Sequence, residues 1–270
     1  MKSIVITGSS SGLGKAAAKQ FAERGWKVAA TMRKPEKETE LNQIKNVSLY
    51  ALDVSDTTSI NDAAEKIISD FGQVDALVNN AGYGSYGILE VTPEEKMRRQ
   101  FDVNVIGMLL VTQAFLPNMR ENGSGVIVNV SSVGGKFAYP MGTLYHGSKF
   151  AVEGMSEALY YELSTVGIRV KIVEPGGIKS NFGTSSFDMN VEGSSEAYQP
   201  LVDRAVAAVA ASAGGGSEPS VIAQVVYEAV TDDVDKLRYP AGPGTANFLQ
   251  TRKEMSDAEF MAMIKKQNGL

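Results

Sequence analysis

The 270-residue sequence contains no cysteine and only one histidine, His146. The absence of cysteine excludes disulfide bonds, thiolate metal sites and a cysteine nucleophile, and it suits a reducing compartment. A single histidine makes a multi-histidine zinc site or a histidine-based catalytic triad hard to build. We therefore expect no metal site, and we expect a cytoplasmic protein.

The sequence also lacks a basic surplus and a long apolar run. The sequence has 26 Lys and Arg residues and 31 Asp and Glu residues, which gives a net charge of −5. There is therefore no excess of positive charge to neutralise a nucleic-acid backbone. No apolar run reaches the roughly 18 residues of a membrane span. The first one, Ile4-Val5-Ile6, ends at Thr7-Gly8 and is too short for a signal peptide. These features exclude a nucleic-acid partner and a membrane-spanning segment.

Short apolar runs alternate with segments of helical spacing along the first two thirds of the chain. Helical spacing is seen at about 14–24 and at 59–71. This alternation predicts a doubly wound α/β fold, with a mostly parallel, seven-stranded sheet and helices on both faces. The expected strands are at 2–7, 28–31, 47–52, 75–78, 125–130, 169–173 and 238–240.

The chain has no internal repeat and no long linker, so we expect residues 1–270 to form a single domain. Residues 178–220 are rich in glycine and serine and have weak periodicity, which is typical of a mobile lid. Residues 245–267 are expected to form a C-terminal helical tail. The sequence leaves open whether this tail packs on the body or closes the entrance to a binding site.

A glycine-rich loop, Thr7-Gly8-Ser9-Ser10-Ser11-Gly12-Leu13-Gly14, joins the first predicted strand to the first helix. Three glycines let the main chain approach a pyrophosphate closely, and the helix N-terminus beyond them offers N–H groups and a positive dipole end. The Gly-x3-Gly-x-Gly spacing differs from the common Gly-x-Gly-x-x-Gly fingerprint. By itself the loop is also compatible with an ordinary strand-to-helix turn.

Further motifs follow the later strands, and their combination is specific. They are Asp53-Val54, Asn79-Asn80-Ala81-Gly82, Asn104, Ser132, Tyr145-x3-Lys149 and Pro175-Gly176. In this order, from residue 3 to about 180, they resemble the short-chain dehydrogenase/reductase family in its smaller, non-extended form. The tract Glu174–Gly177 and the tail after Arg238 look most like the steroid/retinol dehydrogenase-like branch.

The resemblance implies a Rossmann-type fold and a nicotinamide dinucleotide cofactor. Asp53 would accept a hydrogen bond from the adenine amino group, although a helix cap is its alternative role, one that Ser55 or Asp56 would serve better. Asn79 is expected to tie strands together, and the main chain of Ile178 to meet the nicotinamide. The residues that the resemblance assigns to the cofactor are Gly8, Ser10, Ser11, Gly12, Leu13, Gly14, Arg33, Asp53, Val54, Asn80, Ala81, Gly82, Tyr145, Lys149, Pro175, Gly176 and Ile178.

The end of the second predicted strand bears on the choice between NADP and NAD. NAD-preferring relatives carry a carboxylate there that accepts from the ribose 2′-hydroxyl, but the corresponding position here looks like Met32. Arg33 follows and can bind a 2′-phosphate through a charge-assisted contact of about 1.5–3 kcal/mol, to which Lys34 can add. The alternative is that both are solvated loop cations. We expect NADP(H), with NAD less favoured.

Hydride transfer to a ketone leaves an alkoxide that needs a proton. By resemblance Tyr145 supplies it as general acid and, in oxidation, removes it as general base. The ordinary tyrosine pKa of about 10 must fall by ~2–3 units, which takes about 3–4 kcal/mol. Lys149 lies one helical turn along and can stabilise the phenolate, helped by the positive nicotinamide ring. Lys149 would also bond the nicotinamide ribose.

Three polar residues complete the expected site. Ser132 can hold the substrate carbonyl beside Tyr145, with Ser131 as the competing choice. Asn104 is polar within the apolar helix predicted at 103–116, and by resemblance it holds a water that links Lys149 to solvent. The alternative, a backbone-bonding asparagine at a helix kink, is compatible with that role. His146 neighbours Tyr145 but points about 100° away on a helix, so we expect it to have a packing or surface role.

The residues expected to face the substrate are apolar and aromatic. This favours a hydrophobic ketone, aldehyde or secondary alcohol, as in a carbonyl reductase or ketoreductase, and the alternative is a non-catalytic NADP-sensing regulator of the same fold. Helix 103–116 is apolar nearly all round, and relatives pair it with the next helix across subunits, so we expect a homodimer or homotetramer. The substrate candidates are Tyr83, Tyr86, Phe137, Tyr139 and Met141, together with Phe182, Phe187 and Met189 of the predicted lid.

Overall fold

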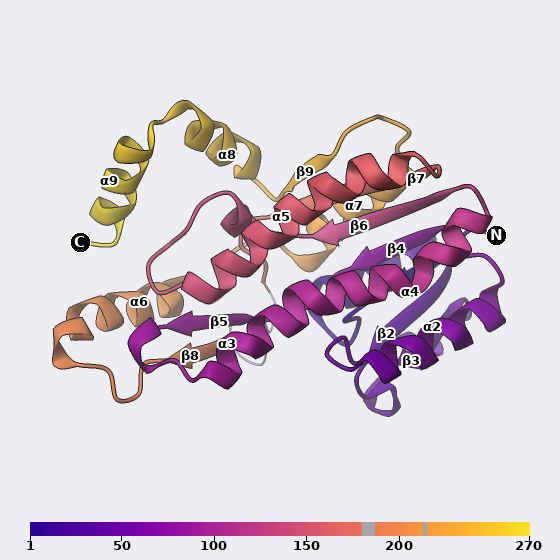
Figure 1. Ribbon diagram of the computed structural model, residues 1–270, viewed down its shortest axis with the longest axis horizontal. Helices are drawn as coiled ribbons and strands as arrows, with labels where there is room; N and C mark the ends of the chain where they lie inside the picture. The colour runs from indigo at the N-terminus through magenta and orange to yellow at the C-terminus, as the bar shows by residue number, and fades with distance from the viewer. Residues whose placement is uncertain (180–186, 213–214) are drawn as a thin grey trace.

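A seven-stranded sheet forms the centre of the protein in a computed structural model, which describes residues 1–179, 187–212 and 215–270. The strand order is β3-β2-β1-β4-β6-β7-β9, and every neighbouring pair is parallel. The predicted doubly wound α/β fold is therefore confirmed (Figure 1). The strands are β1 (Ser3–Ile6), β2 (Lys27–Met32), β3 (Val47–Ala51), β4 (Ala76–Asn79), β6 (Gly125–Val130), β7 (Ile168–Pro175) and β9 (Arg238–Ala241).

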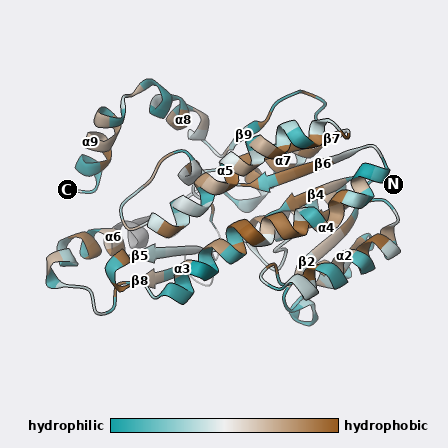
Figure 2. Ribbon diagram, viewed as in Figure 1, coloured by the Kyte–Doolittle hydropathy of each residue, from teal (hydrophilic) through white to brown (hydrophobic). Residues whose placement is uncertain are grey.

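Helices cover both faces of this sheet because successive strand residues point to opposite sides. On β1, Ile4 and Ile6 pack in one core with helices α1 and α7, whereas Val5 packs in the other with α2, α4 and α5. The central strands are hydrophobic along most of their length (Figure 2). These helices are α1 (Gly12–Glu23), α2 (Thr57–Phe71), α4 (Gly107–Glu121), α5 (Thr143–Ser164) and α7 (Pro219–Thr231).

Local sequence explains where α2 begins and ends. The Asp56 carboxylate accepts from the main-chain N–H groups of Thr58 and Ser59 at 2.9 and 3.3 Å and so caps the helix N-terminus. The helix stops at Gly72, whose φ of +77° is a left-handed conformation that glycine adopts without strain. Among the two cap candidates in the sequence, Asp56 rather than Ser55 forms the cap.

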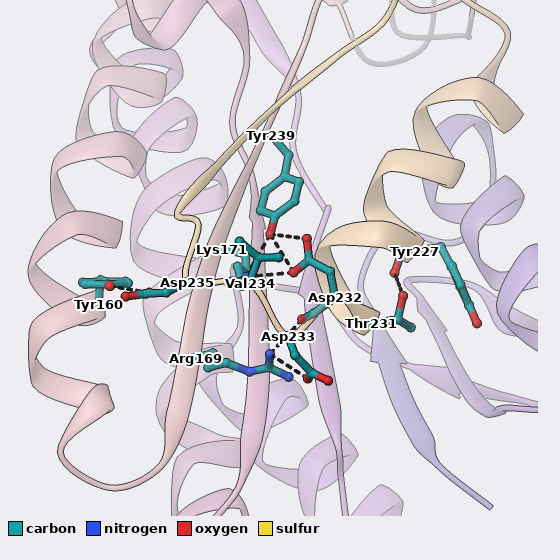
Figure 3. Close-up of polar contacts among 10 residues, drawn as sticks. All are labelled: Tyr160, Arg169, Lys171, Tyr227, Thr231, Asp232, Asp233, Val234, Asp235 and Tyr239. Carbon is teal, nitrogen blue, oxygen red and sulfur yellow. Dashed lines mark hydrogen bonds and ion pairs between the residues drawn. The ribbon is translucent and has the colours of Figure 1, made fainter.

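The outermost strand, β9, is fastened to β7 by a buried ammonium group (Figure 3). Lys171 of β7 donates to Asp232 at 3.1 Å, to the Val234 carbonyl at 2.6 Å and to the Tyr239 hydroxyl at 2.8 Å. Tyr239 in turn donates to Asp232 at 2.8 Å. This network lies between the end of α7 and β9, and it explains how a strand of four residues keeps its place at the sheet edge.

A second, two-stranded sheet projects from the body beside α3 (Glu94–Phe101). It joins β5 (Gly84–Gly87) to β8 (Phe187–Asn190) in parallel, and the sequence did not predict it. The Asn190 amide donates to the Ser85 hydroxyl and to the Tyr86 carbonyl, at 2.9 and 3.1 Å. Residues 178–220, interpreted as a lid, thus include β8, helix α6 (Gln199–Ser212) and the start of α7. Whether this region moves remains a prediction.

The C-terminal tail forms two helices, α8 (Thr245–Glu254) and α9 (Asp257–Gln267). Leu249, Phe260 and Ile264 bury against Phe137, which belongs to the segment between β6 and α5. The tail therefore packs on the segment that follows Ser132. In the part of the chain that the structure describes, no helix has both the length and the apolar character needed to cross a membrane.

Candidate active site

The candidate site lies at the edge of the sheet where the parallel strands end. β1 runs into the glycine loop, with the Thr7 N–H bonded to the Val78 carbonyl of β4 at 3.0 Å. β6 runs into Ser131, whose N–H bonds the Val173 carbonyl of β7 at 2.8 Å. In Figure 1 the arrow of β6 points toward the side that carries β5, β8 and α6. The loops predicted to hold cofactor and substrate therefore meet at one edge, the usual place for ligands in such sheets.

The glycine loop has the shape that a pyrophosphate requires. Gly8 and Gly12 adopt φ of +69° and +54°, and a Cβ at Gly14 would lie 2.4 Å from the Gly8 carbonyl oxygen. Ser11, the N-cap residue of α1, makes no side-chain capping bond, and the first turn of α1 carries no acidic residue. The main-chain donors and positive dipole end of α1 thus fit an anionic group.

A short set of hydrogen bonds fixes the glycine loop to the end of β4. The Asn80 amide donates to the carbonyls of Thr7 and Gly8 at 2.8 and 3.2 Å. The Thr7 hydroxyl accepts from the N–H groups of Asn80 and Ala81 at 2.9 and 3.0 Å. Thr7 is a positioning residue that the sequence analysis did not single out, although its place directly before Gly8 was a usable signal.

The residues assigned to the adenosine end surround the ends of β2 and β3. One Asp53 carboxylate oxygen accepts from the N–H and hydroxyl of Ser55, at 3.0 and 2.7 Å. Burial raises the pKa of Asp53, but these bonds and the charges of Arg33 and Arg99 outweigh it, so the pKa lies below its ordinary value. Arg33 is exposed, whereas Met32 is buried. The Arg33 guanidinium is thus exposed to solvent and near Asp53, the carboxylate predicted to bind adenine.

The segment after β7 offers main-chain groups at the same edge. The Gly176 N–H bonds the Ala241 carbonyl at 3.0 Å. Ser217 pairs with this segment by donating to the Gly177 carbonyl at 2.8 Å and accepting from the Lys179 N–H at 2.9 Å. Because alternate residues of a strand direct their main-chain groups to opposite sides, those of Ile178 point away from Ser217. These are the groups predicted to contact the nicotinamide.

Ser132 and Tyr145 meet in the structure. The Ser132 hydroxyl lies close enough to the Tyr145 hydroxyl to lower the pKa of the phenol, and the Ser132 oxygen accepts from the Gly134 N–H at 3.0 Å. Ser131 is buried and faces Gly135 instead, since a Cβ there would lie 2.8 Å from the Ser131 hydroxyl oxygen. Of the two serines, Ser132 is therefore the one placed to act with Tyr145.

Lys149 lies one turn along α5, with its ammonium nitrogen 6.0 Å from the centre of the Tyr145 ring. It donates to the Val130 carbonyl at 2.9 Å. Burial lowers the pKa of Lys149 to about 8, although the charge of Glu153 opposes the shift. Burial raises the pKa of Tyr145, and the Ser132 hydroxyl offsets this only in part. Desolvation of the phenol therefore dominates the pKa of Tyr145 in this structure, and its lowering by Lys149 and a bound nicotinamide stays a prediction.

Asn104 lies on a π-helical turn, Asp102–Ile106, that joins α3 to α4. Its carbonyl oxygen accepts from the Tyr83 N–H at 3.0 Å, and its amide donates to the Tyr83 carbonyl and the Ser148 hydroxyl at 2.9 and 3.1 Å. Ser148 donates to the Tyr145 carbonyl at 2.7 Å. The side chain thus bonds main-chain groups, as the alternative role requires, and the compatible water-holding role remains a prediction. Such turns recur at functional sites.

Aromatic rings continue from Tyr145 toward the two-stranded sheet. The Tyr86 ring stacks on Tyr145, with ring centres 5.3 Å apart and planes 29° apart, and Phe187 stacks on Tyr86 at 5.1 Å. Met189 and Tyr83 also belong to this part of the molecule, and Tyr83 is buried. The structure therefore brings the predicted substrate residues Tyr86 and Phe187 to Tyr145, the tyrosine predicted to be catalytic.

The other predicted substrate residues have mixed positions. Tyr139 is 41% exposed and packs edge-on against Phe137 at 5.1 Å. Met141 is buried with Ile88 and Val202 and adopts a φ of +62°, a strained conformation for a residue with a side chain. Its side chain packs in a core cluster. Phe182 lies outside the described residues.

Comparison with known proteins agrees with this geometry. The model of the family described as short chain dehydrogenase matches residues 2–191, and the chain belongs to that family. An uncharacterized oxidoreductase of Schizosaccharomyces pombe is 40% identical over 242 residues, which cover 88% of this chain and 100% of the relative. A 3-ketodihydrosphingosine reductase of Bacteroides thetaiotaomicron is 35% identical over 240 residues, covering 89% and 87%.

Solved structures show the same fold. A short-chain dehydrogenase from Streptomyces avermitilis is 33% identical with a TM-score of 0.85, covering 99% of this chain and 97% of that one. ElxO with NADP bound is 27% identical with a TM-score of 0.74, covering 91% and 99%. A 3-ketoacyl-(acyl-carrier-protein) reductase from Brucella melitensis complexed with NADH is 26% identical with a TM-score of 0.75, covering 90% and 98%.

Proposed function

We propose that this protein is an NADP(H)-dependent oxidoreductase that transfers a hydride between nicotinamide and a hydrophobic ketone, aldehyde or secondary alcohol. One observation carries the proposal: the neighbouring Ser132 and Tyr145 hydroxyls lie, with Lys149, at the same sheet edge as the glycine loop. In that position a proton donor, a carbonyl anchor and a buried cation act on one substrate atom.

The residues would divide the work as follows. NADP(H), when bound, supplies or accepts the hydride. Ser132 would donate to the carbonyl oxygen of the substrate, and Tyr145 would transfer its phenolic proton to that oxygen as charge develops. The Lys149 cation would stabilise the phenolate that results. In oxidation the same phenolate would take the proton back from the alcohol.

The preference for NADP rests on the end of β2. Arg33 is exposed there, and Met32, where NAD-preferring relatives are expected to carry a carboxylate, has a buried side chain that cannot accept a hydrogen bond. The NADP complex of ElxO supports this choice, whereas the NADH complex of the Brucella reductase shows that the fold also accepts the other dinucleotide.

A hydrophobic substrate is favoured by the aromatic stack of Tyr86 and Phe187 on Tyr145. The relative named as a 3-ketodihydrosphingosine reductase agrees with reduction of a ketone. We propose that the region 178–220 covers the substrate, since β8 brings Phe187 beside Tyr86 and α6 packs near Met141. Residues 1–270 would then act as one domain.

The proposal is tested by following NADPH absorbance at 340 nm with a panel of aryl and alkyl ketones. The wild-type protein should oxidise NADPH, and Tyr145→Phe should lower kcat by about 10²–10⁴-fold because the proton donor is lost. Binding of NADPH, measured by its fluorescence, should stay nearly unchanged in this variant. NADPH binding without turnover of any carbonyl or alcohol would instead favour the non-catalytic NADP-sensing protein.

A further inference from the structure

His146 lies one residue after Tyr145, and both of its ring nitrogens are engaged. Nδ1 lies 2.9 Å from the Gly134 carbonyl oxygen, and Nε2 accepts from the Tyr139 N–H at 3.0 Å. Because a main-chain N–H can only donate, Nε2 must be unprotonated, and the ring proton must reside on Nδ1. The two bonds therefore require one neutral tautomer of the imidazole.

Two glycines enclose this ring. A Cβ at Gly134 would lie 2.7 Å from Nδ1 of His146, and a Cβ at Gly142 would lie 2.3 Å from its Cδ2. The ring is buried between them, so the segment on both sides of it approaches α5 as closely as glycine allows. His146 thus connects both ends of the segment 134–142 to the helix that carries Tyr145.

This segment determines where Ser132 points. The Ser132 hydroxyl is held by the Gly134 N–H, and Gly134 is in turn held by His146. At the other end, the Met141 carbonyl accepts from the Gly87 N–H at 2.8 Å. Phe137 also packs this segment on the C-terminal tail, but loss of the His146 bonds would remove the polar contacts that tie the segment to α5 and would loosen the Ser132 hydroxyl.

We propose that His146 is a positioning residue that, as a neutral imidazole, holds residues 134–142 against α5 and thereby keeps Ser132 aligned with Tyr145. Protonation of Nε2 would convert an acceptor into a donor and set two N–H groups against each other at the Tyr139 position. The segment would then loosen in acid. The effect on catalysis rests on the proposed function, whereas the effect on the segment does not.

The groups around the ring favour the neutral form. The titratable side chains that face it are Tyr86 of β5, Tyr139 of the segment and Tyr145 of α5, at 6.0, 6.2 and 5.6 Å between ring centres. Burial raises the pKa of all three phenols, so they carry no charge at neutral pH. Burial also lowers the pKa of His146, although the Gly134 bond opposes the shift.

The charged side chains nearby in sequence are engaged elsewhere. Lys136, on the same segment, lies 3.8 Å from Glu153. Lys149, on the same helix, donates to the Val130 carbonyl. Among the described residues, no carboxylate forms an ion pair with His146 that would stabilise its charged form.

Three substitutions of His146 distinguish the contribution of its bond to the Gly134 carbonyl from that of its bond to the Tyr139 N–H. His146→Asn keeps an amide donor near the Nδ1 position but has no acceptor for Tyr139. His146→Gln places an amide oxygen near the Nε2 position, where it can accept from Tyr139 without being titratable, and His146→Ala removes both bonds. Tyr239→Phe is the matched control, because it removes buried hydrogen bonds to Lys171 and Asp232 far from this segment.

Hydrogen exchange of the peptide that contains Tyr139, measured by mass spectrometry, tests the bond without any substrate. At about pH 7 the wild type, His146→Gln and Tyr239→Phe should protect this amide, whereas His146→Asn and His146→Ala should exchange about 10-fold faster. At about pH 5, after correction for chemical exchange, the wild type should lose protection and His146→Gln should keep it. Equal protection in all variants would overturn the proposal.

The catalytic arm uses NADPH and 1-phenyl-1,2-propanedione as the probe carbonyl. The kcat of His146→Asn should fall about 10-fold with little change in the KM for NADPH, because the aligned Ser132 is lost and the cofactor site is not. The wild type should lose kcat/KM in acid, and His146→Gln should lack this acidic limb. An unchanged limb in His146→Gln would contradict the proposal. Failure of the wild type to reduce any carbonyl would overturn the proposed function only, since hydrogen exchange still decides the role of His146.

Discussion

Arg33 is the residue on which the choice between two dinucleotides is expected to depend. It is exposed, it follows the buried Met32, and its charge helps to lower the pKa of Asp53. A guanidinium group in this position can form paired, charge-assisted bonds to a phosphate. A carboxylate in its place would instead accept from a ribose hydroxyl and repel a phosphate.

Arg33→Asp should therefore raise the Kd for NADPH about 10–100-fold and leave the Kd for NADH equal or lower, because ~1.5–3 kcal/mol of charge-assisted bonding is lost. The measurement is titration of each reduced dinucleotide by fluorescence. Lys45→Asp makes the same change of charge on an exposed residue before β3 and should leave both affinities unchanged. Equal weakening of both dinucleotides would show that Arg33 does not contact the 2′-phosphate.

Some single-residue roles could be predicted from the sequence, and others could not. The expected structural role of Asn79 is confirmed, since its amide bonds Thr112 and Asn129 at 2.9 Å each. The full role of His146 could not be predicted, because it depends on Gly134 and Tyr139, which a folded loop brings to both ring nitrogens. The rotation between adjacent helix residues predicts that the His146 side chain points away from that of Tyr145, but it does not predict which groups the His146 side chain meets.

At the scale of elements, α5, β7 and β9 contribute to a buried charge cluster behind Lys149. Arg238 of β9 lies 3.0 Å from the Glu153 carboxylate of α5 and 3.4 Å from that of Glu174 of β7. Both glutamates are buried. Burial and the like charge of Glu153 raise the pKa of Glu174 to about 7, although Lys136 and Arg238 oppose the shift.

This shift makes stability depend on pH in a definite direction. The Glu174 carboxyl binds its proton more tightly in the folded than in the unfolded state, so its contribution to stability is present in acid and is lost as pH rises through about 7. Glu174→Gln resembles the protonated acid at every pH. It should have the wild-type free energy of unfolding near pH 5 and exceed it by about 1–2 kcal/mol near pH 8, measured by urea denaturation.

Glu121→Gln provides the control for this comparison, because it removes the same charge from an exposed position at the end of α4. Its stability should follow the wild type at both pH values. A Glu174→Gln variant that is less stable than the wild type near pH 8 would mean that the ion pair with Arg238 outweighs the cost of burying the second carboxylate.

The regular elements were predictable where one physical cause dominates. Strands of the central sheet are continuous apolar runs because helices cover them on both faces. Helix α2 has apolar residues at helical spacing and begins after a capping aspartate, Asp56. The pair of β5 and β8 was not predictable. Its sequences, Gly84–Gly87 and Phe187–Asn190, have no strand pattern. The Asn190 amide joins β8 to Ser85 of β5, and Lys96 of α3 holds β8 by bonding Asn190.

At the scale of the whole molecule, the end of α3, the π-helical turn Asp102–Ile106 and α5 leave an apolar area uncovered in a single chain. Phe101, Ile106 and Phe150 are 37%, 46% and 48% exposed, and Gly147 of α5 lies beside the Phe101 ring. The chain is brown where α3 runs into α4 (Figure 2). The predicted burial of this helix on both sides is thus incomplete within one chain, which is what an interface between copies would complete.

Light scattering at micromolar concentration tests this expectation. The wild type should have the mass of two or four chains, and the double variant Ile106→Glu with Phe150→Glu should have the mass of one, because two charges would be buried without partners. Val221→Glu, on the exposed side of α7, is the control and should keep the wild-type mass. A wild-type protein with the mass of one chain would contradict the prediction that this apolar area is an interface between copies.

The edge strand β9 has a consequence for how copies of the protein can associate. The Ala241 carbonyl accepts from the N–H of Gly176, the residue that follows β7, so residues one position away, including Pro240, direct their main-chain groups outward. A proline there has no N–H to offer a further strand, and Arg238 adds a charge close by. Addition of a foreign strand to this border of the sheet is therefore disfavoured, because the outward-facing main chain of β9 cannot offer a complete set of hydrogen-bond donors.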